Sequence, residues 1–285
     1  MSAPLILTLS CVDKIGIVAA VSGFLARQGC NILESAQYFD PATRLFFLRT
    51  VFANERGSSL VELDNAFAPI KAEFAMSAAF HDTAAPLRAL LFVSKFDHCL
   101  QELLYQQRAG SLKIHVAGIV SNHPDAEPLA DFYRIPYHYL PLSPGAGGKA
   151  EQEQKIWQLI EGERADLVVL ARYMQIFSDT LCAKLPGRAI NIHHSFLPSF
   201  KGAKPYHQAH QRGVKIMGAT AHYITAELDE GPIIEQEITR INHAHTPEEM
   251  MEMGRSLESL VLFRAVKYHA EHRVVLNGAK TVVFR

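Results

Sequence analysis

Three near-continuous apolar runs constrain the fold of this chain most. They span Ala89–Val93, Ile114–Val120 and Leu167–Ala171, and stretches with helical spacing separate them. A strand is continuously apolar when both of its faces are buried, as happens when helices cover a parallel sheet on both sides. We therefore predict a mainly parallel α/β sheet. The expected helices lie near residues 97–108, 125–134, 149–162 and 178–185, and a last long helix begins at Thr246-Pro247.

The first 84 residues follow a different order of elements. Apolar periodicity and turn residues predict strand, helix, strand, strand, helix and strand within residues 5–81. This βαββαβ order with antiparallel hairpins is ferredoxin-like. Residues 82–86 (DTAAP) form a short linker, so we expect two domains that span residues 1–84 and 85–285.

The first domain carries a more specific pattern in Leu9–Val18 (LSCVDKIGIV) and Gly29–Ile32 (GCNI). These segments resemble the ACT family of regulatory domains. The resemblance implies a site for a small amino-acid effector, with Asp13, Gly16, Ile17 and Asn31 as its residues, or pairing with another copy. A purely structural module without a ligand stays an alternative. Because an isolated sheet of this kind exposes an edge strand and one face, we expect a homo-oligomer.

Charge and composition exclude several partners. The chain of 285 residues has 28 basic and 29 acidic side chains and no long basic run, so we expect no nucleic-acid partner. We expect no membrane segment, because no apolar stretch reaches about 18 residues, and we expect a cytoplasmic location. The four cysteines lie in apolar contexts and are interpreted as reduced core residues.

The candidate catalytic residues are an amide, an imidazole and a carboxylate. Asn191 and His193 are two residues apart in an extended apolar segment, so on a strand both face the same side. Asp229 precedes the turn residues Gly231 and Pro232, and a carboxylate there can reach the ends of the strands. The imidazole can move a proton, the carboxylate can fix its orientation, and the amide can stabilise an oxyanion. Together they predict metal-free addition of a nucleophile to a carbonyl-like carbon.

The segments Asn191–Pro198 (NIHHSFLP) and Leu228–Pro232 (LDEGP) resemble the motif pair of the folate-dependent formyltransferase family. The resemblance covers roughly residues 88–285. It implies a Rossmann-like formyltransferase domain in which Asn191, His193 and Asp229 are catalytic. It also implies that residues 171–177 and 225–229 hold a pterin ring, largely through backbone groups. The substrate-binding residues expected on this basis are Met174, Ile176, Phe177, Ser195, His222, Thr225, Glu227 and Leu228.

Water is the acceptor that the sequence favours. Related glycinamide ribonucleotide transformylases cradle an acceptor phosphate in a Gly-rich loop, whereas residues 94–99 here read SKFDHC. We expect no extra RNA-binding domain of the kind found in methionyl-tRNA formyltransferases, because only about 40 residues follow Ile241. The resemblance thus implies the deformylase branch, which hydrolyses 10-formyltetrahydrofolate to tetrahydrofolate and to formate for purine synthesis and one-carbon balance. Formyl transfer to an unphosphorylated acceptor and a silent amino-acid sensor stay open.

We expect neither a metal nor a cofactor, since folate is the substrate. The pairs His207/His210 and His269/His272 have helical spacing, but neither belongs to an H-E-x-x-H pattern. His194 stands where related transferases have proline. This second imidazole could help to activate water or merely pack.

Overall fold

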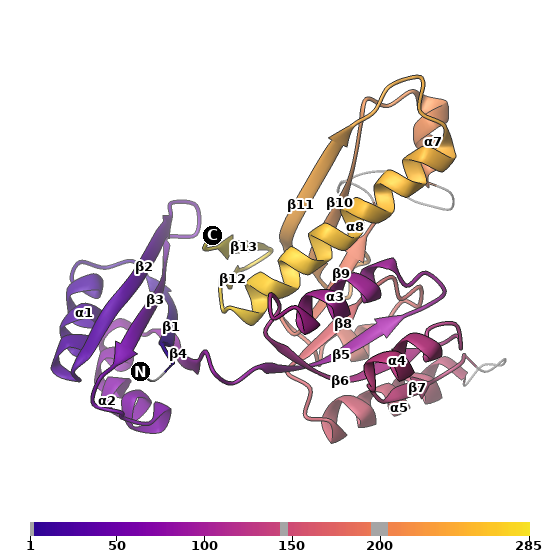
Figure 1. Ribbon diagram of the computed structural model, residues 1–285. Coiled ribbons are helices and arrows are strands. Elements are labelled where there is room, and N and C mark those ends of the chain that lie inside the picture. The colour runs from indigo at the N-terminus through magenta and orange to yellow at the C-terminus, as the bar shows by residue number, and fades with distance from the viewer. Residues whose placement is uncertain (1–2, 143–147, 195–204) are drawn as a thin grey trace. The chain divides into compact units, whose positions relative to one another are not determined.

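The computed structural model describes residues 3–142, 148–194 and 205–285. The chain divides into two compact units, which are described separately (Figure 1). The first unit comprises the residues up to Pro86 together with Glu271–Arg285, and the second comprises Leu87–Ala270.

The first unit contains an antiparallel sheet with two helices packed against it. The strand order is β2-β3-β1-β4, which confirms the ferredoxin-like βαββαβ prediction. The elements are β1 (Leu5–Val12), α1 (Ile17–Arg27), β2 (Cys30–Asp40), β3 (Leu45–Asn54), α2 (Leu60–Phe74) and β4 (Ser77–Asp82). The core lies between the helices and the sheet, and Phe24, Phe52 and Phe67 are among its buried side chains.

The helix boundaries of this unit follow from local sequence. Gly29 follows α1 with a φ of 68°, the left-handed conformation that glycine adopts without strain at a helix end. Ser59 and Glu62 form a reciprocal capping box at the start of α2.

The C-terminal hairpin packs on the first unit rather than the second. Its strands are β12 (Val274–Asn277) and β13 (Lys280–Val283). The carboxylate of Asp40 accepts hydrogen bonds from Asn277 at 2.6 Å and from Lys280 at 2.9 Å. Arg49 is 3% exposed and donates to the backbone carbonyls of Glu271 and His272. The first unit runs to Pro86 at the end of the linker, and residues 271–285 belong to it rather than to the second unit.

The second unit is built on one sheet, which has seven strands within the described residues. The order is β11-β10-β9-β8-β5-β6-β7, and the pairs from β9 to β7 are all parallel. The elements are β5 (Leu87–Val93), α3 (His98–Arg108), β6 (Ile114–Ser121), α4 (Glu127–Tyr133), β7 (Tyr137–Tyr139), α5 (Gly148–Gly162), β8 (Leu167–Leu170), α6 (Asp179–Cys182), β9 (Ala189–His193), α7 (Pro205–Arg212), β10 (Ile216–Tyr223), β11 (Ile233–Arg240) and α8 (Pro247–Ala270). The mainly parallel sheet is confirmed. The antiparallel pairing of β10 and β11 was not predicted.

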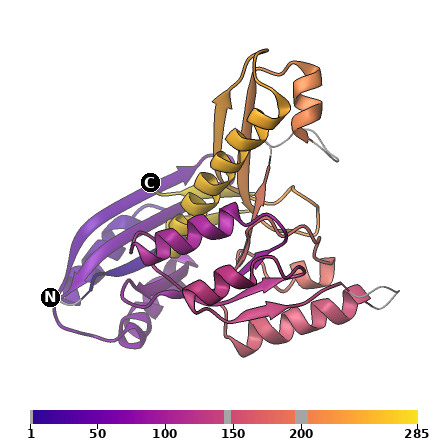
Figure 2. The same ribbon diagram turned by 45° about the vertical axis from the view of Figure 1, so that its right-hand side comes forward.

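Helices α3 and α8 lie side by side in this unit, and α8 also packs along β9, β10 and β11 (Figure 2). Residues of α5 and α6 share one apolar core with β5 and β8. The strand order reverses between β5 and β8, and ligands of such sheets bind beyond the carboxyl ends of the strands at this point. No helix within the described part of the chain is long and apolar enough to cross a membrane.

Candidate active site

Strand β9 carries two of the three predicted catalytic residues. Asn191 and His193 alternate with the buried Ile190 and Ile192, so both polar side chains lie on one face of the sheet. β9 is the parallel neighbour of β8, and its carboxyl end therefore lies beside the point where the strand order reverses. The strand positions an amide and an imidazole where this architecture binds ligands.

Asp229 faces His193 from the loop between β10 and β11. Its Oδ2 lies 3.2 Å from Nδ1 of His193, and the side chains of His193 and Asp229 are 13% and 23% exposed. Burial alone would raise the pKa of the Asp229 carboxyl, but hydrogen bonds with His193 and His222 outweigh it and hold the pKa well below its usual range. The ionised carboxylate fixes Nδ1 of His193, and Nε2 is then the nitrogen that can exchange a proton with a reactant.

His222 supports both Asn191 and Asp229 from within the sheet. It is 2% exposed, and its Nδ1 lies 2.8 Å from the carbonyl oxygen of Tyr223, to which it can only donate. In the neutral ring, Nε2 accepts from the amide nitrogen of Asn191 at 3.3 Å. The same Nε2 lies 3.6 Å from Oδ1 of Asp229, toward which it can donate when the ring is protonated. The buried side chain is placed to orient Asn191 and Asp229, and the substrate contact expected for His222 stays a prediction.

The loop that carries Asp229 is tightly folded against β10. Asp229 has a φ of 58°, a left-handed conformation that aspartate tolerates better than most residues. A Cβ atom at Gly231 would lie 1.7 Å from the carbonyl oxygen of Tyr223, so glycine is required there. The backbone N–H of Tyr223 donates to the carbonyl of Pro232 at 2.9 Å. These contacts fix the end of the loop, just after Asp229, against the last residue of β10.

The segment after β8, expected to hold the pterin, is anchored to the end of β5. The hydroxyl of Ser94 donates to Asn122 and accepts from the backbone N–H of Met174 at 2.9 Å. Met174 and Ile176 are 56% and 58% exposed, whereas Phe177 is buried in the core. The side chains of Met174 and Ile176 can therefore meet a ligand directly, and Phe177 can do so only through its backbone.

The other expected substrate residues lie mainly in the Asp229 loop. The hydroxyl of Thr225 donates to the carbonyl of Glu227 at 2.9 Å and closes a turn before Asp229. Leu228 is 56% exposed at the tip of the loop. Ser195 lies outside the described residues.

The four residues expected to bind an effector lie at two places in the first unit: Asp13, Gly16 and Ile17 at the start of α1, and Asn31 at the start of β2. The strand register pairs Val12 with Leu45 and Asn31 with Ala53, so these two places are at opposite ends of the sheet. Gly16 is the N-cap of α1 with a φ of 100°. Asp13 and Asn31 are exposed, but Ile17 is 2% exposed and belongs to the core. One chain therefore does not bring Asn31 together with Asp13 and Gly16, and the buried side chain of Ile17 is not available to an effector.

Two features of the second unit were not found from the sequence. The first is the supporting position of His222. The second is Glu258, which lies in the buried stripe of α8 with Met250 and Gly254. Glu258 could have been noticed because it is a charged residue at helical spacing within a stripe of buried residues. The apolar residues of that stripe were interpreted only as core packing. His269 and His272 do not share a helix face, because α8 ends at Ala270.

Comparison with known proteins identifies the family of the chain. Residues 87–266 match the model of the formyl transferase family. The chain is 47% identical to formyltetrahydrofolate deformylase from Corynebacterium sp. (strain P-1) over 98% of each chain. The chain belongs to the formyltetrahydrofolate deformylase family.

Other members of this family match it at similar levels. The deformylase of Bacillus subtilis (strain 168) is 46% identical, with 98% of this chain and 93% of the relative covered. The crystal structure of the deformylase from Burkholderia mallei ATCC 23344 superposes with a TM-score of 0.95 and 49% identity. It covers 99% of this chain and 100% of the other. The similarity therefore extends over both units.

We expect Gly231→Ala to displace the Asp229 loop, because the new Cβ would collide with the backbone of β10. The variant should lose about 1–3 kcal/mol of stability, as overpacked sites do. Hydrogen exchange of residues 224–232 should become faster. Gly162→Ala is the matched control, since a Cβ there meets nothing within 4 Å. Equal stability and equal exchange in the two variants would contradict the tight loop.

Proposed function

We propose that this chain hydrolyses 10-formyltetrahydrofolate to formate and tetrahydrofolate. The observation that carries the proposal is the placement of Asn191, His193 and Asp229 at the carboxyl edge of a parallel sheet, with an ionised Asp229 beside His193. The similarity to named formyltetrahydrofolate deformylases along nearly the whole chain supports it. Folate is the substrate in this proposal, and no cofactor takes part.

The first step is addition of water to the N10-formyl carbon. The pair of His193 and Asp229 accepts a proton as the oxygen of water bonds to that carbon. The carbonyl oxygen becomes an oxyanion, and the side-chain amide of Asn191 donates to it. His222 holds this amide in place from behind. Loss of one such donor typically slows a reaction about 10²- to 10³-fold.

The second step is collapse of the tetrahedral intermediate. The oxyanion re-forms a carbonyl, the bond from carbon to N10 breaks, and N10 receives the proton held by the pair of His193 and Asp229. The products are tetrahydrofolate and formic acid, which ionises to formate and a proton in water. Because the acid and the base are the same pair, one histidine serves both steps.

The pterin ring is proposed to lie between the Arg172–Phe177 segment and the Asp229 loop. Met174, Ile176 and Leu228 expose apolar side chains there, and the neighbouring backbone supplies hydrogen-bonding groups. Ser94 fixes the first of these segments.

Formate release from 10-formyltetrahydrofolate, with a chelator present and no acceptor added, tests this function. We expect the wild type to release formate, Asn191→Ala to be at least about 100-fold slower, and His193→Ala and Asp229→Asn to be inactive or nearly so. His243→Ala is the control, because this histidine is exposed outside the site. A wild type that releases no formate would contradict the proposal and favour formyl transfer to an unphosphorylated acceptor.

We also propose that the first unit pairs with a second copy of the chain and binds a small amino acid. Strand β2 lies at an edge of the sheet and exposes the apolar side chains Ile32, Leu33, Tyr38 and Phe39. A long apolar edge strand tends to pair with another strand. Asn31 lies on this edge strand and is exposed, so its amide offers a polar group to an effector.

Light scattering tests this pairing. We expect the wild type to have a multiple of the 31.7 kDa chain mass. Leu33→Lys should lower the mass, and Val61→Lys, which changes an exposed residue of α2, should not. The same measurement with each common amino acid tests the effector through a change in mass or melting temperature. A monomeric wild type would contradict the pairing, and no response to any amino acid would contradict the effector.

A further inference from the structure

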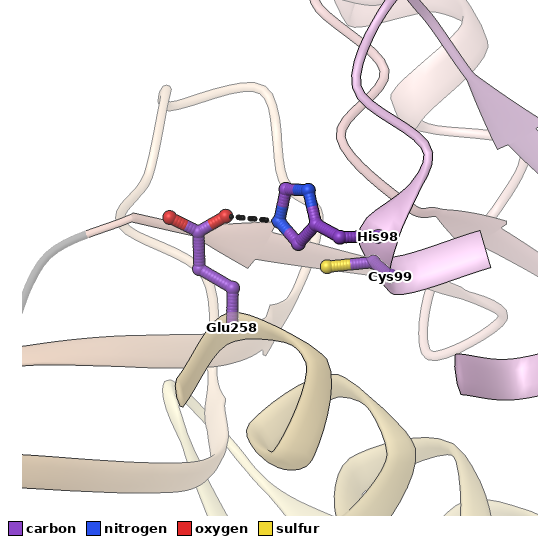
Figure 3. Close-up of side chains that lie close together, drawn as sticks. All are labelled: His98, Cys99 and Glu258. Atoms are coloured by element: carbon purple, nitrogen blue, oxygen red, sulfur yellow. Dashed lines mark hydrogen bonds and ion pairs between the residues drawn. The ribbon is translucent and has the colours of Figure 1, made fainter. Parts of the chain in front are cut away.

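A buried carboxylate lies close to the catalytic residues of the second unit. Glu258 on α8 is 1% exposed and faces His98 at the start of α3 (Figure 3). Its Oε2 lies 2.8 Å from Nε2 of His98 and 3.4 Å from Nε of Arg172. Its Oε1 accepts from the hydroxyl of Tyr206 at 2.8 Å. Both carboxylate oxygens therefore have partners from three other parts of the unit.

A glycine on α8 leaves room for the contact between Tyr206 and Glu258. Gly254 lies one helical turn before Glu258, and a Cβ there would lie 2.1 Å from the hydroxyl of Tyr206. The missing side chain lets the tyrosine reach across α8 to the carboxylate. Burial alone would raise the pKa of Glu258, but the hydrogen bond from His98 and the charge of Arg172 lower it overall. Glu258 is thus a buried anion with matched partners.

A metal site is the first alternative for this cluster. Among the described residues, His98, Cys99 and Glu258 form the one group of three whose ligand atoms lie close enough to hold an ion. The carboxylate is already bonded to Tyr206, and the guanidinium of Arg172 adds a positive charge beside it. Burial also raises the pKa of the Cys99 thiol. The chemistry therefore favours an internal network over a cation site. We call this network, Glu258 with His98, Arg172 and Tyr206, the anchor.

His194, the residue next to His193, lies beside this cluster. The ring of His194 lies 5.0 Å from the ring of His193 and 6.4 Å from that of Tyr206, measured between centroids. Burial, then the charge of Arg172 and then His193 lower the pKa of His194 to about 4, against the opposing effect of Glu258. A neutral imidazole here can accept a hydrogen bond from water.

We propose that Glu258 is a positioning residue which, through Tyr206 and Arg172, fixes His194 beside His193 so that His194 holds the attacking water. This inference rests on the proposed hydrolysis. It gives His194 a role in the reaction, and it gives Glu258 an indirect role through His194.

A double-mutant cycle on formate release tests the proposal. We expect Glu258→Gln to lower kcat about 10- to 100-fold with little change in KM, as loss of a supporting residue does. His194→Ala should lower kcat at least as much. If Glu258 acts through His194, adding Glu258→Gln to His194→Ala should cost little more. Additive losses would overturn the proposal.

Two further variants separate this role from simple packing. Tyr206→Phe removes one hydroxyl from the anchor and should lower kcat in the same direction, even if Glu258→Gln fails to fold. Cys99→Ala changes a fully buried neighbour whose sulfur is not part of the anchor, and its kcat should equal that of the wild type. A Tyr206→Phe variant with wild-type kcat would overturn the proposal. So would stoichiometric zinc in the wild type that Cys99→Ala loses.

The outcomes also separate this inference from the proposed function. A wild type that releases no formate would overturn both. A wild type that releases formate, with His194→Ala equally active, would overturn this inference alone.

Discussion

The contact between His193 and Asp229 depends on the sheet of the second unit. The two residues come from a parallel strand and from the loop of an antiparallel hairpin, and they meet because β10 pairs with β9. The loop can hold its carboxylate there because Gly231 allows it to touch the backbone of Tyr223. The pairing of β9 with β10 and one tight loop thus determine the geometry of the pair that is proposed to transfer the proton.

Burial of the charged groups around this pair costs desolvation free energy, which their hydrogen-bond and ion-pair partners must offset. An unpaired carboxylate in such surroundings would cost several kcal/mol, so each one needs close partners. Asp229 has His193 and His222, and Glu258 has His98, Arg172 and Tyr206. These groups come from strands, loops and helices that are far apart in the sequence. The polar network therefore ties α3, α7 and α8 to the edge of the sheet where the reaction is proposed to occur.

The parallel strands could be predicted because runs such as Leu167–Ala171 are apolar on both faces. The same-face placement of Asn191 and His193 followed from strand alternation. The direction of β10 and the docking of the C-terminal hairpin could not be predicted, since both depend on contacts between residues distant in sequence. Asp40 with Lys280 is one example. Glu258 was missed, and the contacts of His222 with Asn191 and Asp229 were not foreseen, because a single polar residue in an apolar segment does not reveal its partner.

The most direct test of the hydrolysis is the origin of the oxygen in the product. The purified protein would convert 10-formyltetrahydrofolate in water labelled with oxygen-18, and mass spectrometry would follow the formate. Attack by water at the formyl carbon predicts one labelled oxygen in each formate molecule formed on the enzyme. Formate without the label, or consumption of the substrate without formate, would contradict the hydrolysis and point to another acceptor.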